Sequence, residues 1–93
     1  MDDSRPRPID ADLTLWRDHR DVDALERVFA ATAARLQLIA ARLVGDGDAA
    51  KDVVQRAFLV VVEHPERWDP RRPGWPWLVG IVAREARGLR RSE

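Results

Sequence analysis

The sequence predicts an all-α protein, a small helical bundle of three main helices preceded by a short N-terminal helix. Two observations favour this fold class. Apolar residues recur every three, four or seven positions over long segments, and prolines and glycines collect between those segments, where they end helices. With 93 residues and no cysteine, the chain has room for one domain whose stability must come from helix packing rather than disulfides.

The N-terminal part is expected to contain a flexible segment and one short helix. Residues 1–8 include two prolines and no apolar period, so we expect a flexible lead-in, with residues 9–93 forming the domain. From Asp10 onward, Leu13 and Trp16 lie three residues apart. This spacing predicts a helix that ends near His19 or Arg20 and lies across the main bundle.

The first long helix is expected to begin at an aspartate cap, Asp21 or Asp23, and to run to Val44. Gly45-Asp46-Gly47 then ends it, because glycine and aspartate favour turns. The apolar residues of its predicted core face are Leu25, Val28, Phe29, Leu36, Ile39 and Leu43.

The second long helix is expected to begin at an Asp48 cap. The run Val60-Val61-Val62 would also suit a strand, but it lies inside a helical pattern of about 16 residues, so its length favours a helix. The predicted core residues of this helix are Val53, Val54, Ala57, Phe58, Val61 and Val62.

Residues 65–76 hold four of the six prolines and predict a loop. Pro76 suits the first turn of a last helix, because proline lacks the amide proton that the first turn leaves without a partner. The predicted core residues of that helix are Trp77, Leu78, Ile81, Val82, Ala86 and Leu89. Its arginines are expected to face solvent.

The charge is neutral in total but unevenly distributed. Residues 1–66 carry 9 basic and 13 acidic side chains, whereas residues 67–93 carry 7 basic and 3 acidic ones. A basic end favours a polyanionic partner. The apolar runs are far shorter than the roughly 20 residues that cross a bilayer, and the N-terminus is acidic, so we expect a cytoplasmic protein with no membrane partner.

Catalytic and metal-binding patterns are not found in the sequence. His19 and His64 lack metal-ligand spacing, and no Ser-His-Asp set, P-loop or His-Glu-x-x-His pattern occurs. Asp46, Asp48 and Asp52 alternate as in a calcium loop, but the later bidentate glutamate is missing. We therefore expect no enzyme activity, no metal site and no cofactor.

Three segments, in this order, resemble region 2 of the extracytoplasmic-function type of sigma-70 family sigma factors. They are Leu43-Val44-Gly45-Asp46, then Asp52-Val53-Val54-Gln55 with Ala57-Phe58, then Trp77-Leu78 with Ile81-Val82-Ala83-Arg84. The resemblance covers about Asp10 to Arg91 and includes no counterpart of the family's region 4 domain. It implies a transcription initiation module that binds core RNA polymerase and recognises and melts the minus-ten promoter element.

The resemblance also implies which residues contact the polymerase. In the family, this helix docks on the clamp helices of the largest polymerase subunit, so the implied docking residues are Asp52, Gln55, Arg56 and Leu59. Polar groups suit a basic coiled-coil partner, because charge complementarity sets the register of docking. Arg56 stands where the family usually has glutamate.

The loop and last helix resemble the part of the family that melts the minus-ten element and holds a flipped base. Basic side chains can follow a nucleic-acid backbone while aromatic rings stack on its bases. The implied promoter-DNA residues are Arg67, Arg71, Arg72, Arg84, Arg87, Arg90 and Arg91, with Trp68 and Trp75 as stacking platforms. Alternatively, the loop tryptophans only attach the loop to the bundle. An alternative function is a sigma-like protein-interaction module that has lost polymerase docking and binds an anti-sigma factor or itself.

Overall fold

The computed structural model describes residues 8–91, and its regular elements are all helical. They are α1 (Pro8–His19), α2 (Val22–Val44), α3 (Gly47–Glu63), the short 3-10 helix η1 (Pro65–Arg67) and α4 (Gly74–Arg91). The prediction of an all-α bundle with three long helices and a short N-terminal helix is confirmed. Pro8 already belongs to α1, and residues 1–7 of the expected lead-in lie outside the described residues.

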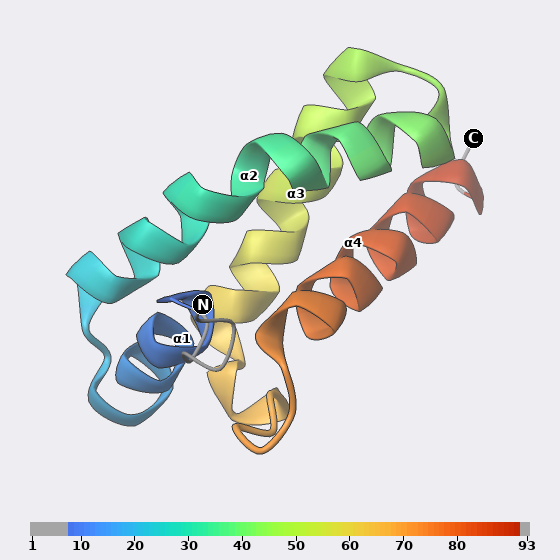
Figure 1. Cartoon of the computed structure of the whole chain (residues 1–93). Helices are drawn as coiled ribbons and strands as arrows, with labels where there is room; N and C mark the ends of the chain where they lie inside the picture. The colour runs from blue at the N-terminus through green and yellow to red at the C-terminus, as the bar shows by residue number, and fades with distance from the viewer. Residues whose placement is uncertain (1–7, 92–93) are drawn as a thin grey trace, which may run out of the picture.

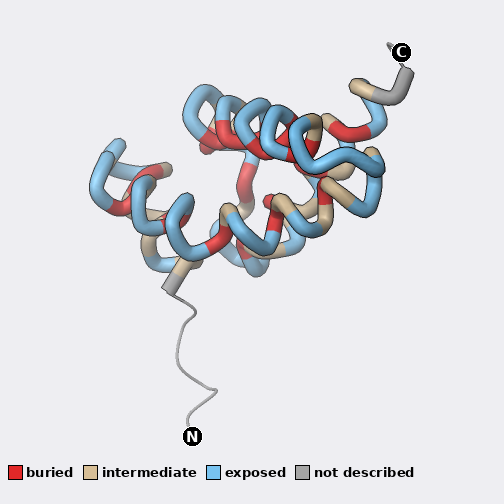
Figure 2. The backbone as a smooth tube through the Cα atoms, turned by 90° about the horizontal axis from the view of Figure 1, so that it is seen from above, coloured by how far each residue is buried: buried red, intermediate tan, exposed pale blue. Residues whose placement is uncertain are grey.

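The three long helices pack against one another, and α1 closes one end of the bundle (Figure 1). Helix α1 contacts α2, α4 and η1. The segment that joins α3 to α4, residues 64–73, lies at this same end (Figure 1). Figure 2 shows the buried positions on the inner sides of the helices and the exposed positions on their outer sides.

Each helix contributes one apolar side to the core. The larger buried side chains are Leu13, Trp16, Val28, Leu36, Val53, Val54, Phe58, Val61, Trp68, Leu78 and Val82. Burying one such side chain stabilises the fold by about 1.5–3 kcal/mol. The buried polar residue Thr32 donates its hydroxyl to the Val28 carbonyl at 2.7 Å, so its burial leaves no unsatisfied group.

Helix α2 is capped at both ends, by the Asp21 side chain at its start and by the Gly45 backbone at its end. Of the two predicted caps, Asp21 is the one used, since its carboxylate accepts the Ala24 amide at 3.1 Å. At the other end Gly45 adopts the left-handed conformation, with φ 76°, and donates its amide to the Ala41 carbonyl at 2.7 Å. The predicted end at Val44 is confirmed.

Helix α3 begins earlier than the sequence predicted. Its cap is Asp46, whose carboxylate accepts the Asp48 amide at 3.0 Å, so the assignment of the cap to Asp48 was wrong. Gly47 becomes the first helical residue. Asp48 then lies in the first turn, where its negative charge suits the positive end of the helix dipole.

Three residues predicted in the core are partly exposed: Phe29 at 43%, Leu43 at 39% and Val62 at 38%. The buried row of α2 recurs every fourth residue and includes small side chains, namely Ala24, Val28, Thr32, Leu36 and Ala40. Small residues let the helices approach closely along this row. The apolar stripe in the sequence is therefore wider than the face that is buried.

The predicted loop 65–76 contains two helical pieces. Residues Pro65–Arg67 form η1, and α4 already begins at Gly74, which places Pro76 in its first turn as expected. Helix α1 likewise begins at Pro8, two residues before the predicted start. The irregular segment is thus shorter than proline content alone indicates.

Candidate protein and nucleic-acid interfaces

The outer face of α3 gathers all four predicted docking residues. Asp52, Gln55, Arg56 and Leu59 are exposed and line one open groove of about 400 Å³, together with Phe58 and Val62. Their spacing of three or four residues places them on one side of the helix. Leu59 is 55% exposed, so the groove has an apolar part between charged and amide groups. We refer to this surface as the α3 groove.

Helix α2 extends this apolar surface. The ring of Phe29 meets the ring of Phe58 edge to face, with 4.9 Å between ring centroids. Phe29 and Val62 were predicted in the core because their apolar side chains fit the helical core pattern, but both are partly exposed. Partial exposure of apolar groups beside a groove is typical of protein-binding surfaces.

The expectation that Trp68 offers a stacking platform was wrong. Its side chain is 3% exposed, and its indole Nε1 donates to the Arg72 carbonyl at 3.1 Å. The ring therefore packs in the core, where no base can stack on it. The alternative given for the loop tryptophans, attachment of the loop to the bundle, describes Trp68 correctly.

The loop arginines are exposed but not equally free. The Arg71 guanidinium donates to both oxygens of Asp69 at 3.1 Å, while its backbone amide donates to Asp69 Oδ1 at 2.9 Å. These hydrogen bonds from Arg71 hold the pKa of Asp69 below its usual range. Arg72 lies near the same carboxylate, with 3.9 Å between its Nε and Asp69 Oδ2. Asp69 therefore partly neutralises Arg71 and Arg72, two of the seven arginines assigned to DNA by the resemblance.

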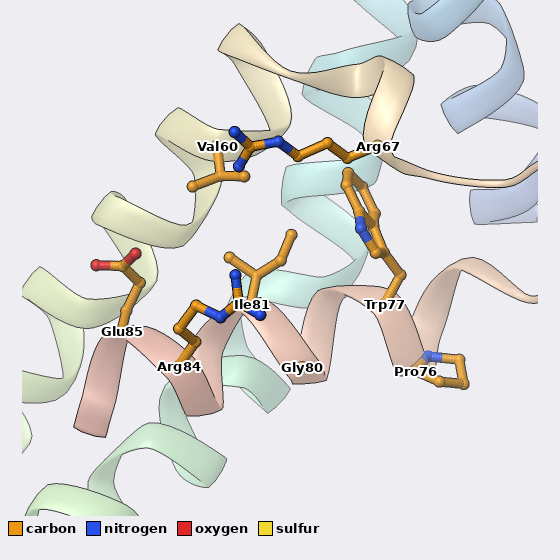
Figure 3. A pocket seen from close by; sticks show the side chains of 8 residues that line it. All are labelled: Val60, Arg67, Pro76, Trp77, Gly80, Ile81, Arg84 and Glu85. Atoms are coloured by element: carbon orange, nitrogen blue, oxygen red, sulfur yellow. The ribbon is translucent and has the colours of Figure 1, made fainter. Parts of the chain in front are cut away.

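A pocket of about 350 Å³ lies where α3, η1 and α4 meet (Figure 3). Its lining residues are Val60, Arg67, Pro76, Trp77, Gly80, Ile81, Arg84 and Glu85. Figure 3 shows Arg67 reaching across from η1 toward Val60, with the ring of Trp77 rising from α4 beside it. Two guanidinium groups and one aromatic wall thus border a partly apolar hollow, which we call the Trp77 pocket.

Trp77 was assigned to the core from its helical spacing, and it is only half-buried. It packs against the core and also lines the Trp77 pocket. A second, more open hollow of about 740 Å³ shares Arg67, Pro76 and Trp77 and extends toward Arg72. The available aromatic surface in this region is therefore that of Trp77, which lies between two hollows bordered by arginines.

Trp75, the other predicted platform, is half-buried at the start of α4. The Arg35 guanidinium of α2 lies over its ring, 5.7 Å from the centroid, which is a cation-π arrangement. Arg35 could not be assigned to this site from the sequence, because no local pattern indicates a contact between residues 40 positions apart. Any base that stacks on this face of Trp75 has to displace or share Arg35.

The arginines of α4 extend the basic surface away from the loop. Arg84 and Arg87 are exposed as predicted. Arg90 and Arg91 belong to the last turn of α4, but their side chains lie outside the described part of the chain. Glu85 is half-buried in the Trp77 pocket and adds one negative charge there.

Between residues 8 and 91, no three histidine, aspartate or glutamate side chains come together as metal ligands. In that same part of the chain, no helix has the length and apolar character needed to span a bilayer.

The fold and these two surfaces define a class of protein. Residues 28–93 match the family described as Sigma-70 region 2. Because this span covers more than half of the chain, the chain belongs to the sigma-70 region 2 family, which confirms the resemblance seen in the sequence. The matched span includes the α3 groove, the Arg-bearing loop and the Trp77 pocket.

The chain is also similar to a curated RNA polymerase sigma factor. It is 39% identical over 71 residues to the RNA polymerase sigma factor CarQ of Myxococcus xanthus. The similar region covers 76% of this chain and 41% of that relative, so the chain corresponds to less than half of the relative's length. No solved structure gave a significant match.

Proposed function

We propose that this chain is a transcription initiation module that binds core RNA polymerase through the α3 groove and promoter DNA through its loop and α4. The proposal rests on the presence of two separate surfaces, the α3 groove and the Trp77 pocket, within one sigma-70 region 2 fold. The α3 groove and the Trp77 pocket share no residue. The two partners would therefore not compete for the same residues. The proposal includes no catalytic step.

The polymerase side rests on the composition of the α3 groove. Asp52 and Gln55 present oxygen and amide groups, and Leu59 and Val62 present apolar surface. Apolar contacts supply affinity, while the flanking charges fix register and speed association. The proposed partner surface is the pair of clamp helices of the largest polymerase subunit.

The DNA side rests on the Trp77 pocket and the arginines around it. Melting the minus-ten element exposes bases, and a flipped base costs a few kcal/mol that a pocket must offset. Stacking on an aromatic ring contributes about 1–3 kcal/mol per base. Trp77 provides the ring, while Arg67 and Arg84 stand at the border of the pocket to contact phosphates.

The test is binding of fluorescently labelled core RNA polymerase to the wild-type chain and to Asp52→Ala. We expect the wild type to bind, and the loss of the exposed acid to weaken binding by at least about tenfold, since removing one partner of a desolvated charge pair costs roughly 2 kcal/mol or more. Lys51→Ala, which changes a neighbouring exposed residue outside the groove, is the matched control. Equal affinities of all three proteins would refute this docking surface.

Arg56 favours a second candidate function, a protein-interaction module that no longer binds polymerase. Its positive charge is exposed and lines the α3 groove beside the docking acid. A like charge facing a basic partner costs several kcal/mol. If Arg56→Glu binds core polymerase and the wild type does not, the second function is supported, and an anti-sigma factor or a second copy becomes the partner to test.

A further inference from the structure

Two side chains from α1 and the residue after it donate hydrogen bonds to the last turn of α3. The last carbonyls of a helix have no partner within the helix. Here the Trp16 indole Nε1 donates to the Val61 carbonyl at 2.9 Å, and the Arg20 guanidinium donates to the Val62 carbonyl at 3.1 Å. Arg20 also lies over the Trp16 ring, 5.2 Å from its centroid. The last turn of α3 has no basic residue of its own, so Arg20 supplies the positive charge that suits the helix dipole.

A side chain of α1 also caps the N-terminal end of α4. The Gly74 amide donates to Asp10 Oδ1 at 2.8 Å, although 64 residues separate them. The first turn of α4 has no acidic residue, so Asp10 supplies the negative charge that suits this end of the helix. A Cβ at position 74 would overlap Leu13 Cδ1 and come within 2.9 Å of Asp10 Oδ1. Glycine at this position is what allows α1 to approach α4.

These two sets of contacts hold the two ends of one loop. Residues 64–73 begin where Trp16 and Arg20 bind α3, and they end where Asp10 binds α4. Helix α1 also contacts η1 inside the loop. Leu13 and Trp16 are buried, so α1 is itself anchored in the core. Figure 1 shows α1 at the end of the bundle where this loop lies.

We propose that α1, with the residue that follows it, is a positioning element for the DNA-contacting loop, acting through Asp10 and Trp16 of α1 and through Arg20. None of these residues touches the proposed DNA surface, and all three precede the span that matches sigma-70 region 2. By fixing both ends of residues 64–73, α1 sets the direction in which Arg67, Arg71 and Arg72 face. The part of this inference that concerns DNA rests on the proposed function, whereas the part that concerns the loop does not.

The test compares Asp10→Ala with Asp10→Asn and a control, Asp12→Ala. Asparagine keeps the Oδ1 acceptor for the Gly74 amide, whereas alanine removes it. Asp12 lies on the same helix but pairs with Arg27 of α2 at 3.0 Å, away from the loop. Trp16→Phe, which keeps a ring but removes the indole N–H, tests the α3 end. Two readouts are needed: amide hydrogen exchange across residues 64–77, and binding of a single-stranded minus-ten oligonucleotide under conditions where every variant is folded.

We expect Asp10→Ala to speed exchange in residues 64–77 by about fivefold, the usual effect of losing one helix cap. We expect DNA affinity to fall by a similar factor with an unchanged salt dependence, because no phosphate-binding arginine is removed. Asp10→Asn should recover both readouts, and Asp12→Ala should change neither. The inference is overturned if exchange in the loop is unchanged, if it rises equally in all helices, or if asparagine does not recover it. Absence of DNA binding by the wild type would instead contradict the proposed function.

Discussion

At the scale of single residues, Trp68 and Asp69 organise the loop that displays the arginines. The Trp68 indole holds the Arg72 carbonyl, and the Arg72 amide donates to the Asp69 carbonyl at 2.9 Å. The Asp69 carboxylate in turn receives both the amide and the guanidinium of Arg71. Residues 69–72 thus form one closed turn, which is attached to the core through the buried ring of Trp68.

Replacing Trp68 should affect stability before it affects DNA binding. Trp68→Phe keeps an apolar ring but loses the hydrogen bond to Arg72, for an expected loss of about 1 kcal/mol. Trp68→Ala should cost about 3–5 kcal/mol because it leaves a cavity. Urea denaturation measures both free energies of unfolding. Trp75→Ala is the control at a half-buried position, and a larger loss there than for Trp68→Ala would contradict this assignment.

Asp69→Asn should strengthen DNA binding. Asparagine keeps an oxygen for the Arg71 amide but removes the charge that pairs with the Arg71 guanidinium. We expect tighter binding of single-stranded DNA and a salt dependence steeper by about 0.7 in the slope of log K against log salt, the effect of one additional phosphate contact. Binding titrations at four or more salt concentrations test this. An unchanged slope would show that Arg71 does not reach a phosphate.

The same pair of residues sets a pH dependence. The pKa of Asp69 is lowered by its hydrogen bonds from Arg71, so the stabilising contribution of the carboxylate is fully present above the ordinary aspartate pKa. It is lost as the pH falls through the lowered pKa. The Asp69→Asn chain should therefore lose less stability on acidification than the wild type, which parallel thermal unfolding at neutral and acidic pH measures. Identical acid profiles would contradict the pairing.

At the scale of elements, α3 has two sides with different surroundings. Val53, Val54 and Val61 are buried in the core, while Leu59 is exposed in the α3 groove. The buried side determines whether the helix packs. On the exposed side, Leu59 lies with Phe58 and Val62 in one groove, and apolar groups gathered in this way are typical of protein-binding surfaces.

Leu59→Ser should separate these two roles. Because Leu59 is exposed, the free energy of unfolding should change by less than about 0.5 kcal/mol. Binding to core polymerase should fall by about tenfold or more, since central apolar residues dominate interface energies. Val53→Ala is the opposite control, with an expected loss of stability of about 1–3 kcal/mol. Unimpaired polymerase binding by Leu59→Ser would exclude the α3 groove as the docking surface.

At the scale of the whole molecule, a neutral net charge conceals a division between an acidic and a basic part. Three arginines of the loop and α4, namely Arg67, Arg72 and Arg84, line the two hollows on either side of Trp77. The acidic residues of α1 and the start of α2 include Asp10 and Asp12, which bind groups of the protein itself. These two carboxylates therefore contribute to the fold, whereas Arg67 and Arg84 remain exposed beside the Trp77 pocket.

This division predicts a strong salt dependence of DNA binding. If Arg67, Arg72 and Arg84 each neutralise one phosphate of a single strand, while Arg71 stays paired with Asp69, the slope of log K against log salt should be about −2. Replacing Arg84 by glutamine should reduce its magnitude by about 0.7. Fluorescence anisotropy with a minus-ten oligonucleotide measures both slopes, and Arg42→Gln, on the exposed side of α2, is the control. Binding that is insensitive to salt would favour the protein-interaction function.

The number and order of the helices, and the shared outer face of α3, could be predicted from local patterns in the sequence. Apolar spacing and capping residues act within a few positions, so the all-α class, the end of α2 at Val44 and the shared face of Asp52, Gln55 and Leu59 follow from local geometry. The resemblance to sigma factor region 2 rests on the same short segments, and the family match confirms it.

Contacts between residues far apart in the chain could be known only from the folded structure. In it Trp68 is buried, Trp77 lines a pocket, Arg35 lies over Trp75, and the Gly74 amide donates to Asp10. Each of these contacts depends on how whole helices pack, and an aromatic or charged residue has the same local pattern whether it is buried, paired or exposed. The loop could be located from its prolines, but the contacts at its two ends could not, because Asp10, Trp16 and Arg20 lie more than 40 residues earlier in the chain.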